Sequence, residues 1–327
     1  MSDTKQNDLA IVSTSPHVKT KSTTRGIMLD VCIALLPALI ASIYYFGSRA
    51  LAVTLISVVC CVGFEALFCR WTKRPQTARD GSAMVTGLLL AFNLPATLPL
   101  WMVPIGALVA IVVVKMLFGG IGQNFANPTI TGRIVLMLSF TLPMTAWNAP
   151  TGHSWGADAV ATATPMKLLG AQEAMANMPS LWQMFLGRHG GSLGETCALA
   201  LLLGFLYLCA RRIISPVTPF CFVGTVALLS LLKSGFDVTF MTYEILGGGL
   251  LLGAIFMATD YATTPISEKG RAVFAVGCGL LTCLIRFYGN MPEGVSFAIL
   301  IMNLLAPLIE RVTAPRVFGK EKAHGKA

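Results

Sequence analysis

The chain has 327 residues, of which 55% are apolar and 12% charged, and its formal net charge is +9. Soluble domains carry roughly 25% charged residues, so the composition excludes an ordinary soluble protein. The apolar residues form runs of about twenty, the length that a helix needs to cross about 30 Å of hydrocarbon. Because lipid offers the backbone no hydrogen-bond partners, we predict an all-α integral membrane protein.

In chain order, a polar tail (residues 1–25) comes first, and the apolar run after it is too long for a signal-peptide core. The apolar runs predict about ten transmembrane helices, with a long polar stretch after the fifth. They cover residues 26–46, 50–69, 82–94, 99–117 and 128–143, and then 193–211, 217–233, 243–259, 271–287 and 293–311. The predicted units are therefore the tail 1–25, a first repeat 26–143, a loop 144–192, a second repeat 193–311 and a tail 312–327.

Lysine and arginine concentrate on one side of this predicted topology, at both termini and in the loops near residues 70–79, 211–212 and 269–271. Cytoplasmic loops carry such an excess, so both termini are expected to be cytoplasmic and the loop 144–192 to face outward. The same pattern explains the positive charge without nucleic acid as a partner; the partner that it implies is membrane lipid.

The two sets of runs resemble each other. Gly87-Leu-Leu-Leu-Ala91 recurs as Gly249-Leu-Leu-Leu-Gly253, and each stretch is followed by a break that contains a proline. With five spans per set, the second set must be upside down relative to the first, as in inverted-repeat transport folds.

No metal site is predicted. The nine cysteines lie in or beside apolar runs without a C-x-x-C pair, and His153 and His189 are isolated. Chemistry is expected instead in the outer loop, where Asp158 to Thr164 ends in a threonine before Pro165. Ala161 and Ala163 leave the Thr164 hydroxyl unhindered, so it could be esterified by a phosphate; an ordinary Thr-Pro loop is the alternative.

The segment Gly191-Ser-Leu-Gly-Glu-Thr196 precedes the sixth run. Ser192 with Glu195 three residues later fits an N-cap with a capping box, which predicts a helix start. A helix start also attracts phosphate or the polar edge of a flavin, so both interpretations stay open.

Polar residues near broken runs are candidates for an ion path. Asn124 and Asn127 lie in a glycine-rich boundary segment that is either a polar path or a tight turn. Asp260 follows the broken eighth run, where a carboxylate could carry a proton or cation. Arg133 lies within a run, where a charge is usually paired.

Several separated stretches together resemble the family that contains the D subunits of Rnf complexes and the related B subunits of the sodium-pumping NADH:quinone oxidoreductases. The resemblance spans about residues 18–320. It is carried by residues 119–124 with 127–128, 158–164, 191–196, 256–260 with 263–265, and 288–294.

The resemblance implies a urea-transporter-like fold and a membrane subunit of an ion-translocating ferredoxin:NAD oxidoreductase (Rnf) complex. In that family a threonine carries covalent FMN, attached by a flavin transferase on the outer side. Asp158, Ala163 and Thr164 match the family's pattern, while Ala161 stands where a serine is expected. The segment Gly191, Ser192, Gly194, Glu195 and Thr196 would contribute a flavin environment.

Further expectations follow from the same resemblance. Partners would be the other Rnf subunits (A, B, C, E and G) in a bacterial or archaeal inner membrane, and electron transfer would be coupled to Na+ or H+ movement. This chain would not react with NAD on its own, and a second, non-covalent flavin (riboflavin or FMN) is left open. The alternative is a urea- or ammonium-like solute channel without a redox role, because a fold does not fix a function.

Overall fold

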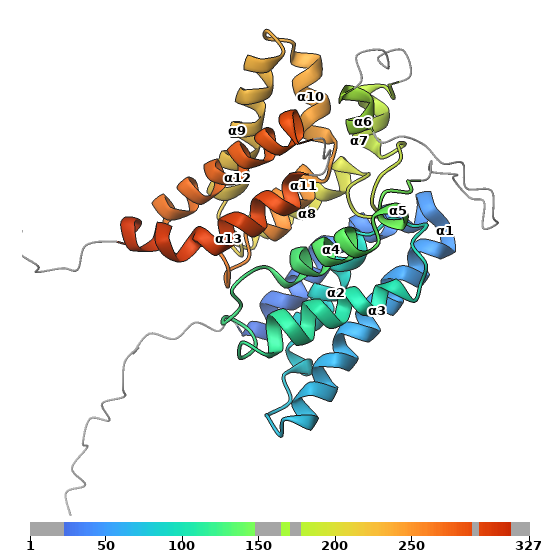
Figure 1. Cartoon of the computed structure of the whole chain (residues 1–327), viewed down its shortest axis with the longest axis vertical. Coiled ribbons are helices and arrows are strands. Elements are labelled where there is room, and N and C mark those ends of the chain that lie inside the picture. The colour runs from blue at the N-terminus through green and yellow to red at the C-terminus, as the bar shows by residue number, and fades with distance from the viewer. Residues whose placement is uncertain (1–22, 148–164, 171–177, 290–293, 315–327) are drawn as a thin grey trace, which may run out of the picture.

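The computed structural model describes residues 23–147, 165–170, 178–289 and 294–314, and every regular element in these residues is helical. The helices pack into one bundle (Figure 1). In the N-terminal half they are α1 (Thr24–Trp71), η1 (Ala78–Asp80), α2 (Ser82–Phe92), α3 (Met102–Leu108), η2 (Val109–Met116), α4 (Pro128–Ser139) and α5 (Thr141–Met144). In the C-terminal half they are α6 (Pro165–Gly170), α7 (Leu181–Leu186), α8 (Ala198–Ala210), α9 (Val217–Lys233), α10 (Val238–Leu246), α11 (Leu250–Leu252), η4 (Gly253–Met257), α12 (Glu268–Tyr288) and α13 (Gly294–Thr313).

Helix α1 has 48 residues and breaks at Gly47, whose backbone has φ 65° and ψ −150°. An unbroken helix of that length would measure about 72 Å at 1.5 Å per residue, far more than a bilayer core. Glycine adopts this backbone conformation without a Cβ penalty. The break therefore turns α1 into two arms, each long enough to cross a bilayer, as the runs 26–46 and 50–69 predict (Figure 1).

The two arms of α1 join two hydrophobic cores. The second arm packs with α2, α3 and η2 in a cluster formed by the N-terminal half. The first arm contributes Ala34, Leu35 and Ala38 to the larger cluster, which holds α8, α9, α12 and α13. Gly204 of α8 lies directly against the carbonyl of Ala34, so a larger residue would separate these two helices.

Two helices of the bundle are wound as π-helices: η2, which continues α3, and η4, which continues α11. Such turns are rare and frequently mark functional sites. The pair α10 and α11–η4 is also bent by 61° at a short break, which forms either a broken span or a re-entrant loop.

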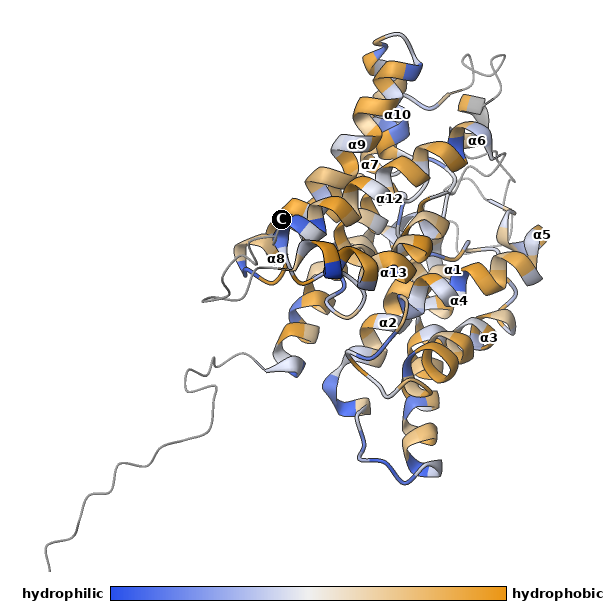
Figure 2. Cartoon of the chain, turned by 60° about the vertical axis from the view of Figure 1, so that its left-hand side comes forward, coloured by the Kyte–Doolittle hydropathy of each residue, from blue (hydrophilic) through white to orange (hydrophobic). Residues whose placement is uncertain are grey.

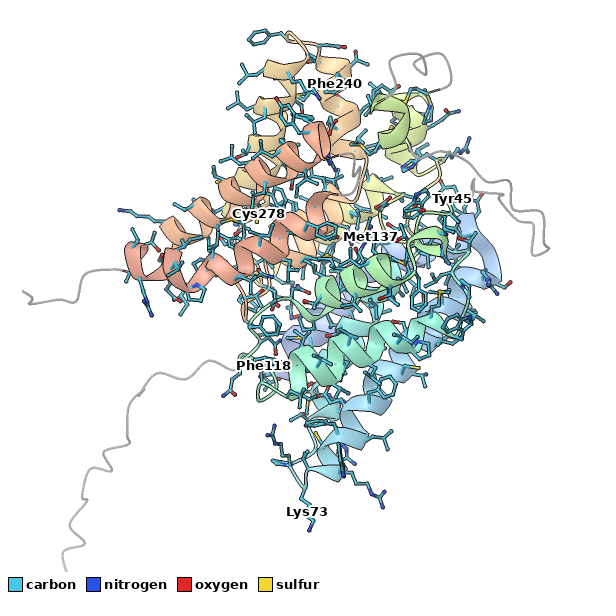
Figure 3. The ribbon with its side chains drawn as sticks, viewed as in Figure 1. Tyr45, Lys73, Phe118, Met137, Phe240 and Cys278 are labelled. Atoms are coloured by element: carbon cyan, nitrogen blue, oxygen red, sulfur yellow. The ribbon has the colours of Figure 1, made fainter. Side chains whose placement is uncertain are left out.

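The surface of the molecule is apolar. Four described helices (α1, α9, α12 and α13) are long and apolar enough to cross a membrane, and the bent pair makes a possible fifth span. Apolar residues cover the helices, while hydrophilic residues gather at helix ends and loops (Figure 2). Lys73, after α1, and Phe240, in α10, mark opposite ends of the molecule (Figure 3). The expectation of a helical membrane protein is therefore confirmed.

Each of the ten predicted runs is helical for most of its length, with α2, α3–η2 and α8 forming shorter apolar helices of 10–17 residues. The number of spans, the inverted repeat and the predicted unit boundaries stay predictions. The residues Asp158, Ala163 and Thr164 lie outside the described part of the chain.

Candidate functional site

A turn of three glycines, Gly247 to Gly249, joins α10 to α11. Gly248 and Gly249 have φ of 65° and 68°, a region that residues with a Cβ rarely adopt. A Cβ on Gly248 would lie 2.6 Å from Nη2 of Arg286, and one on Gly249 would lie 2.9 Å from Oε2 of Glu195. The turn thus brings the backbone close to two buried charged side chains.

Arg286 of α12 holds this turn in place. Its Nη1 donates to the carbonyl of Glu244 at 2.7 Å and to Oε2 of the same residue at 2.9 Å. Its Nη2 donates to the carbonyls of Gly247 at 3.1 Å and Gly248 at 3.2 Å. Both charged side chains are almost fully buried, with exposed fractions of 1% and 4%. A planar guanidinium suits this task because its donors form a rigid fork.

The chain directly after Thr164 packs on the same turn. Pro165 and Met166 are buried, and a Cβ on Gly247 would lie 2.9 Å from Sδ of Met166. A Cβ on Gly248 would lie 3.2 Å from Cγ of the same methionine. Helix α6 therefore contacts the glycine turn through Met166, which follows the predicted acceptor by two positions in the sequence.

The segment Gly191–Thr196 reaches the turn from the other side. The N–H of Leu193 donates to the carbonyl of Leu94 at 3.0 Å, and that of Gly194 donates to the carbonyl of Phe92 at 2.9 Å. The segment is thereby fastened to the break after α2. The carboxylate of Glu195 lies between Gly191 and Gly249, where a Cβ on either glycine would approach it within 3 Å.

One prediction for this segment is wrong. Ser192 does not cap a helix, because α8 begins at Ala198 with Cys197 at its N-cap. Of the two hydrogen bonds of the expected capping box, one forms: the N–H of Ser192 donates to Oε1 of Glu195 at 3.1 Å. The reason is that the N–H groups of residues 193 and 194 donate to the carbonyls of Leu94 and Phe92, around the end of α2, instead of starting a helix.

Four buried polar atoms of Arg286 and the segment Gly191–Thr196 lack a hydrogen-bond partner within the described residues. They are Oγ of Ser192, Oε2 of Glu195, Oγ1 of Thr196 and Nε of Arg286. Buried polar atoms without partners are rare in proteins and call for a ligand, an ion or a water. A ligand that offers both donors and acceptors, as a flavin does, fits this set. Sequence reasoning missed Arg286 and the glycine turn, although three consecutive glycines beside a predicted span were a signal.

A polar junction lies where the broken helices meet. Nη1 of Arg133 donates to Oδ1 of Asn93 at 2.7 Å, which identifies a partner for this buried arginine. Asn127 caps α4 by accepting from the N–H of Thr129 at 3.0 Å, and its Nδ2 donates to the carbonyl of Met257 at 3.3 Å. The C-terminal end of η4 is therefore tied to the start of α4.

A cavity of about 120 Å³ opens beside this junction. Its wall includes Asp260, Asn124 and Asn127, so the structure brings all three candidate ion-path residues together. The rest of the wall is mostly apolar, from α1, α2, α8 and η4, with Lys115 and Ser82 among its polar members. The glycine turn and this cavity thus lie at opposite ends of α11–η4.

Asp260 lies in the loop after η4, outside the candidate spans. Its Oδ1 accepts from the N–H of Ala262 at 3.2 Å, and its Oδ2 accepts from the hydroxyl of Thr263 at 3.3 Å. Burial raises the pKa of its carboxyl, and these two hydrogen bonds oppose the rise only in part. A carboxyl of this kind can hold a proton more readily than a solvated aspartate.

Comparisons with known proteins extend over nearly the whole chain. The family model described as NQR2, RnfD, RnfE matches residues 11–319. The chain is 46% identical over 318 residues to the D subunit of the Na(+)-translocating ferredoxin:NAD(+) oxidoreductase complex of Acetobacterium woodii, covering 97% of both chains. It is 40% identical over 327 residues to the D subunit of the proton-translocating ferredoxin:NAD(+) oxidoreductase complex of Clostridium ljungdahlii, covering 97% of this chain and 98% of the relative.

Proposed function

Because the chain belongs to the NQR2, RnfD, RnfE family, we propose that it is the D subunit of an ion-translocating ferredoxin:NAD oxidoreductase complex. The observation that carries this proposal is the 46% identity over 97% of both chains to a relative of that name. Its role is that of a membrane subunit of a redox-driven translocase, not of the subunit that reacts with NAD. The A, B, C, E and G subunits of the complex are the proposed partners.

We propose that Thr164 carries FMN through a phosphoester bond made by a flavin transferase. Bound there, FMN would accept and release single electrons. The packing of α6 on the glycine turn supports the proposal, because Met166, two positions after Thr164 in the sequence, contacts a turn that also approaches Glu195 and Arg286. Ser192, Glu195 and Thr196 would offer hydrogen bonds to the flavin, and Arg286 would add positive charge near its phosphate. Gly191, Gly194 and Gly249 allow the close backbone approach that this arrangement needs.

The cavity is our proposed site for the ion path and for the second, non-covalent flavin (riboflavin or FMN). A mostly apolar wall with a few convergent polar groups is typical of a small-molecule site. Asp260, Asn124 and Asn127 supply the oxygen atoms that a cation or proton needs. A flavin and a cation in one cavity influence each other electrostatically, which is what redox-driven ion movement requires.

For the arrangement in the membrane, we propose ten spans in two inverted five-helix repeats, within a bacterial or archaeal inner membrane. Both termini would be cytoplasmic, and the loop 144–192 would face outward. Both halves place a short helix before a break, namely α2 before Asn93 and η4 before Ala258, which supports such a repeat. Labelling of single cysteines in residues 148–164 by a membrane-impermeant reagent tests the orientation.

The decisive experiment is expression of the chain with a flavin transferase, followed by a denaturing gel viewed under ultraviolet light. A fluorescent band that disappears in Thr164→Val and persists in Thr162→Val is expected. A band that persists in Thr164→Val and disappears in Thr162→Val would move the attachment by two residues. No band with active transferase present would contradict covalent FMN, and flux of a small solute through the chain in liposomes would favour a channel.

A further inference from the structure

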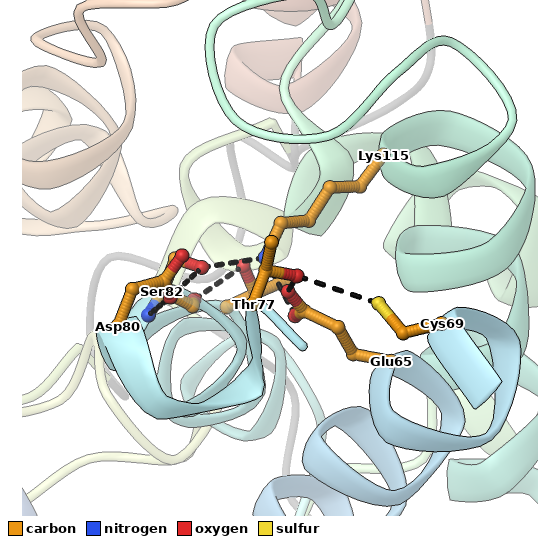
Figure 4. Close-up of polar contacts among 7 residues, drawn as sticks. Glu65, Cys69, Thr77, Asp80, Ser82 and Lys115 are labelled. Carbon is orange, nitrogen blue, oxygen red and sulfur yellow. Dashed lines mark hydrogen bonds and ion pairs between the residues drawn. The ribbon is translucent and has the colours of Figure 1, made fainter. Parts of the chain in front are cut away.

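Lys115, at the end of η2, lies in a buried cluster of oxygen atoms. Its Nζ donates to Oε2 of Glu65 at 2.7 Å and to Oγ of Ser82 at 2.6 Å (Figure 4). Behind these atoms, Thr77 donates to Oε1 of Glu65 at 2.5 Å, and Ser82 donates to Oδ1 of Asp80 at 2.6 Å. The exposed fractions of the Lys115 and Glu65 side chains are 3% and 0%. The cluster thus holds one cation, the ammonium, between oriented oxygen atoms.

This ammonium also forms part of the cavity wall. Lys115 and Ser82 line the cavity together with Asn124, Asn127 and Asp260, so the ammonium and those oxygen atoms border the same space. Neither Glu244 nor Arg286, which form another buried ion pair, lines the cavity. Lysine carries a compact charge on a flexible four-carbon stem, whereas the arginine fork of the other pair binds three carbonyl groups at once.

We propose that the oxygen atoms of Glu65 and Ser82 form a binding site for a monovalent alkali cation, and that the Lys115 ammonium is its tethered occupant. A cation that arrives from the cavity replaces the ammonium, and Lys115 then swings into the cavity. The exchange removes one positive charge and adds one, so the buried carboxylate of Glu65 is never left unpaired. Avoiding an unpaired buried charge is what makes the exchange possible, because such a charge is strongly destabilising.

The winding of η2 favours such movement. In this π-helix the N–H of Leu117 donates to the carbonyl of Val112, and the N–H of Gly120 donates to the carbonyl of Lys115 itself. The backbone around Lys115 is therefore held by wider turns than an α-helix has, and π-turns frequently occur where a helix serves a function. The inference builds on the proposed ion translocation, but its tests below require no electron transfer, so the two can fail separately.

The first test uses the purified full-length chain with Lys115→Met, which leaves Glu65 without its cation. The thermal unfolding midpoint is measured in NaCl, KCl and choline chloride at equal ionic strength. We expect a midpoint in Na+ or K+ at least about 5 °C above that in choline, while the unaltered chain shows a much smaller difference. The salt that gives the larger shift identifies the preferred ion.

Two variants control this test. Lys115→Met with Glu65→Gln removes the charge that the ion would neutralise, so its midpoint should be the same in all three salts. Arg286→Met breaks a buried ion pair away from the cavity, so it should be destabilised equally in all three salts. Equal midpoints for Lys115→Met in the three salts would overturn the proposal. So would an equally large rise of the midpoint in Na+ or K+ for either control variant.

The second test uses the unaltered chain, so it does not depend on how a variant folds. Modification of Lys115 by a water-soluble amine reagent is followed by peptide mass spectrometry. We expect its rate to rise several-fold in saturating Na+ or K+ relative to choline, with Lys233 and Lys269 as internal standards. A rate that depends on pH but not on the alkali cation would contradict the site and indicate a proton instead.

Discussion

Within the residues that the structure describes, each half of the molecule contains one buried ion pair, and the two pairs differ in what surrounds them. In the N-terminal half, Lys115 meets Glu65 among hydroxyl groups at the wall of a cavity. In the C-terminal half, Arg286 meets Glu244 and three backbone carbonyls that shape the glycine turn. The basic residue comes near the end of a helical segment in both cases, α3–η2 and α12.

The difference teaches how one kind of interaction can serve two purposes. A guanidinium that binds four acceptors in a fixed fork is suited to hold a backbone conformation. An ammonium with two oxygen partners and an open cavity beside it is suited to be exchanged. We therefore expect the C-terminal pair to matter most for stability and the N-terminal pair to matter most for ion dependence.

The largest effect is expected for Arg286→Met. This change leaves Glu244 buried without its cation and removes the donors to the glycine turn, so it should cost about 3–5 kcal/mol of the free energy of unfolding. Chemical denaturation of the purified chain measures it. Arg286→Lys keeps the charge without the fork, so its free energy of unfolding should lie between those of Arg286→Met and the unaltered chain. A lysine variant as stable as the unaltered chain would contradict the role of the fork.

Gly248→Ala should have the next largest effect. The alanine would adopt φ near 65° and place its Cβ 2.6 Å from Nη2 of Arg286, so we expect a loss of about 1–3 kcal/mol. A lower flavin content per chain should accompany this loss if the turn lines the flavin site. Gly224→Ala in α9 is the matched control, because nothing lies within 4 Å of its Cβ and it should be neutral or slightly stabilising.

Asn93→Ala tests the polar junction between the end of α2 and α4. It removes the amide that accepts from Arg133 at 2.7 Å, a hydrogen bond to a buried charged group, and should cost about 1–3 kcal/mol. Thr86→Ala in α2, where the hydroxyl donates to the carbonyl of Ser82 at 3.0 Å, is the control and should cost less. Equal losses in the two variants would show that the junction adds nothing beyond ordinary packing.

Asp260→Asn should change the pH dependence of stability. Because burial raises the pKa of Asp260, its ionised form is disfavoured in the folded chain. Its unfavourable contribution is thus present above the folded pKa and is lost as the pH falls through that value. The asparagine variant should therefore be more stable than the unaltered chain at neutral pH, with the gap closing in acid; a gap independent of pH would refute this assignment.

The smallest effect is expected for Arg211→Gln, which breaks the ion pair with Asp30 between α8 and α1. The arginine side chain is 59% exposed, and exposed pairs contribute only about 0–1 kcal/mol because water screens them. Thermal unfolding should hardly change, in contrast to both buried pairs. A loss as large as that of Arg286→Met would mean that burial does not set the difference between these interactions.

The helices could be predicted from the sequence because apolar runs and their glycine and proline breaks are local features. The break of α1 at Gly47 falls between the predicted runs 26–46 and 50–69, and the break of the eighth run precedes Asp260 as expected. The family and the complex could likewise be predicted from the sequence, because separated motifs occur in a fixed order along the chain.

Contacts between distant segments could not be predicted in this way. Glu65 and Lys115 are 50 residues apart, and nothing in either neighbourhood specifies the other. The prediction of a helix start at Ser192 was wrong for the same reason. The N–H groups of residues 193 and 194 donate to carbonyls about a hundred positions earlier in the chain. Each of Asp260, Asn124 and Asn127 could be predicted from the sequence as a candidate for the ion path. That they line one cavity depends on the tertiary structure and could not be predicted.

The π-winding of η2 has a consequence for how this segment can vary in length. A π-turn accommodates one more residue than an α-turn, so deleting Val113 would let residues 109–116 relax into an ordinary α-helix. The helix beyond the deletion would then keep its facing, because the wide turn absorbs the missing residue. A deletion in α12, which is wound as an α-helix, would instead rotate everything after it by about 100° about the helix axis. A change of one residue in length should therefore disturb the packing less in η2 than in α12.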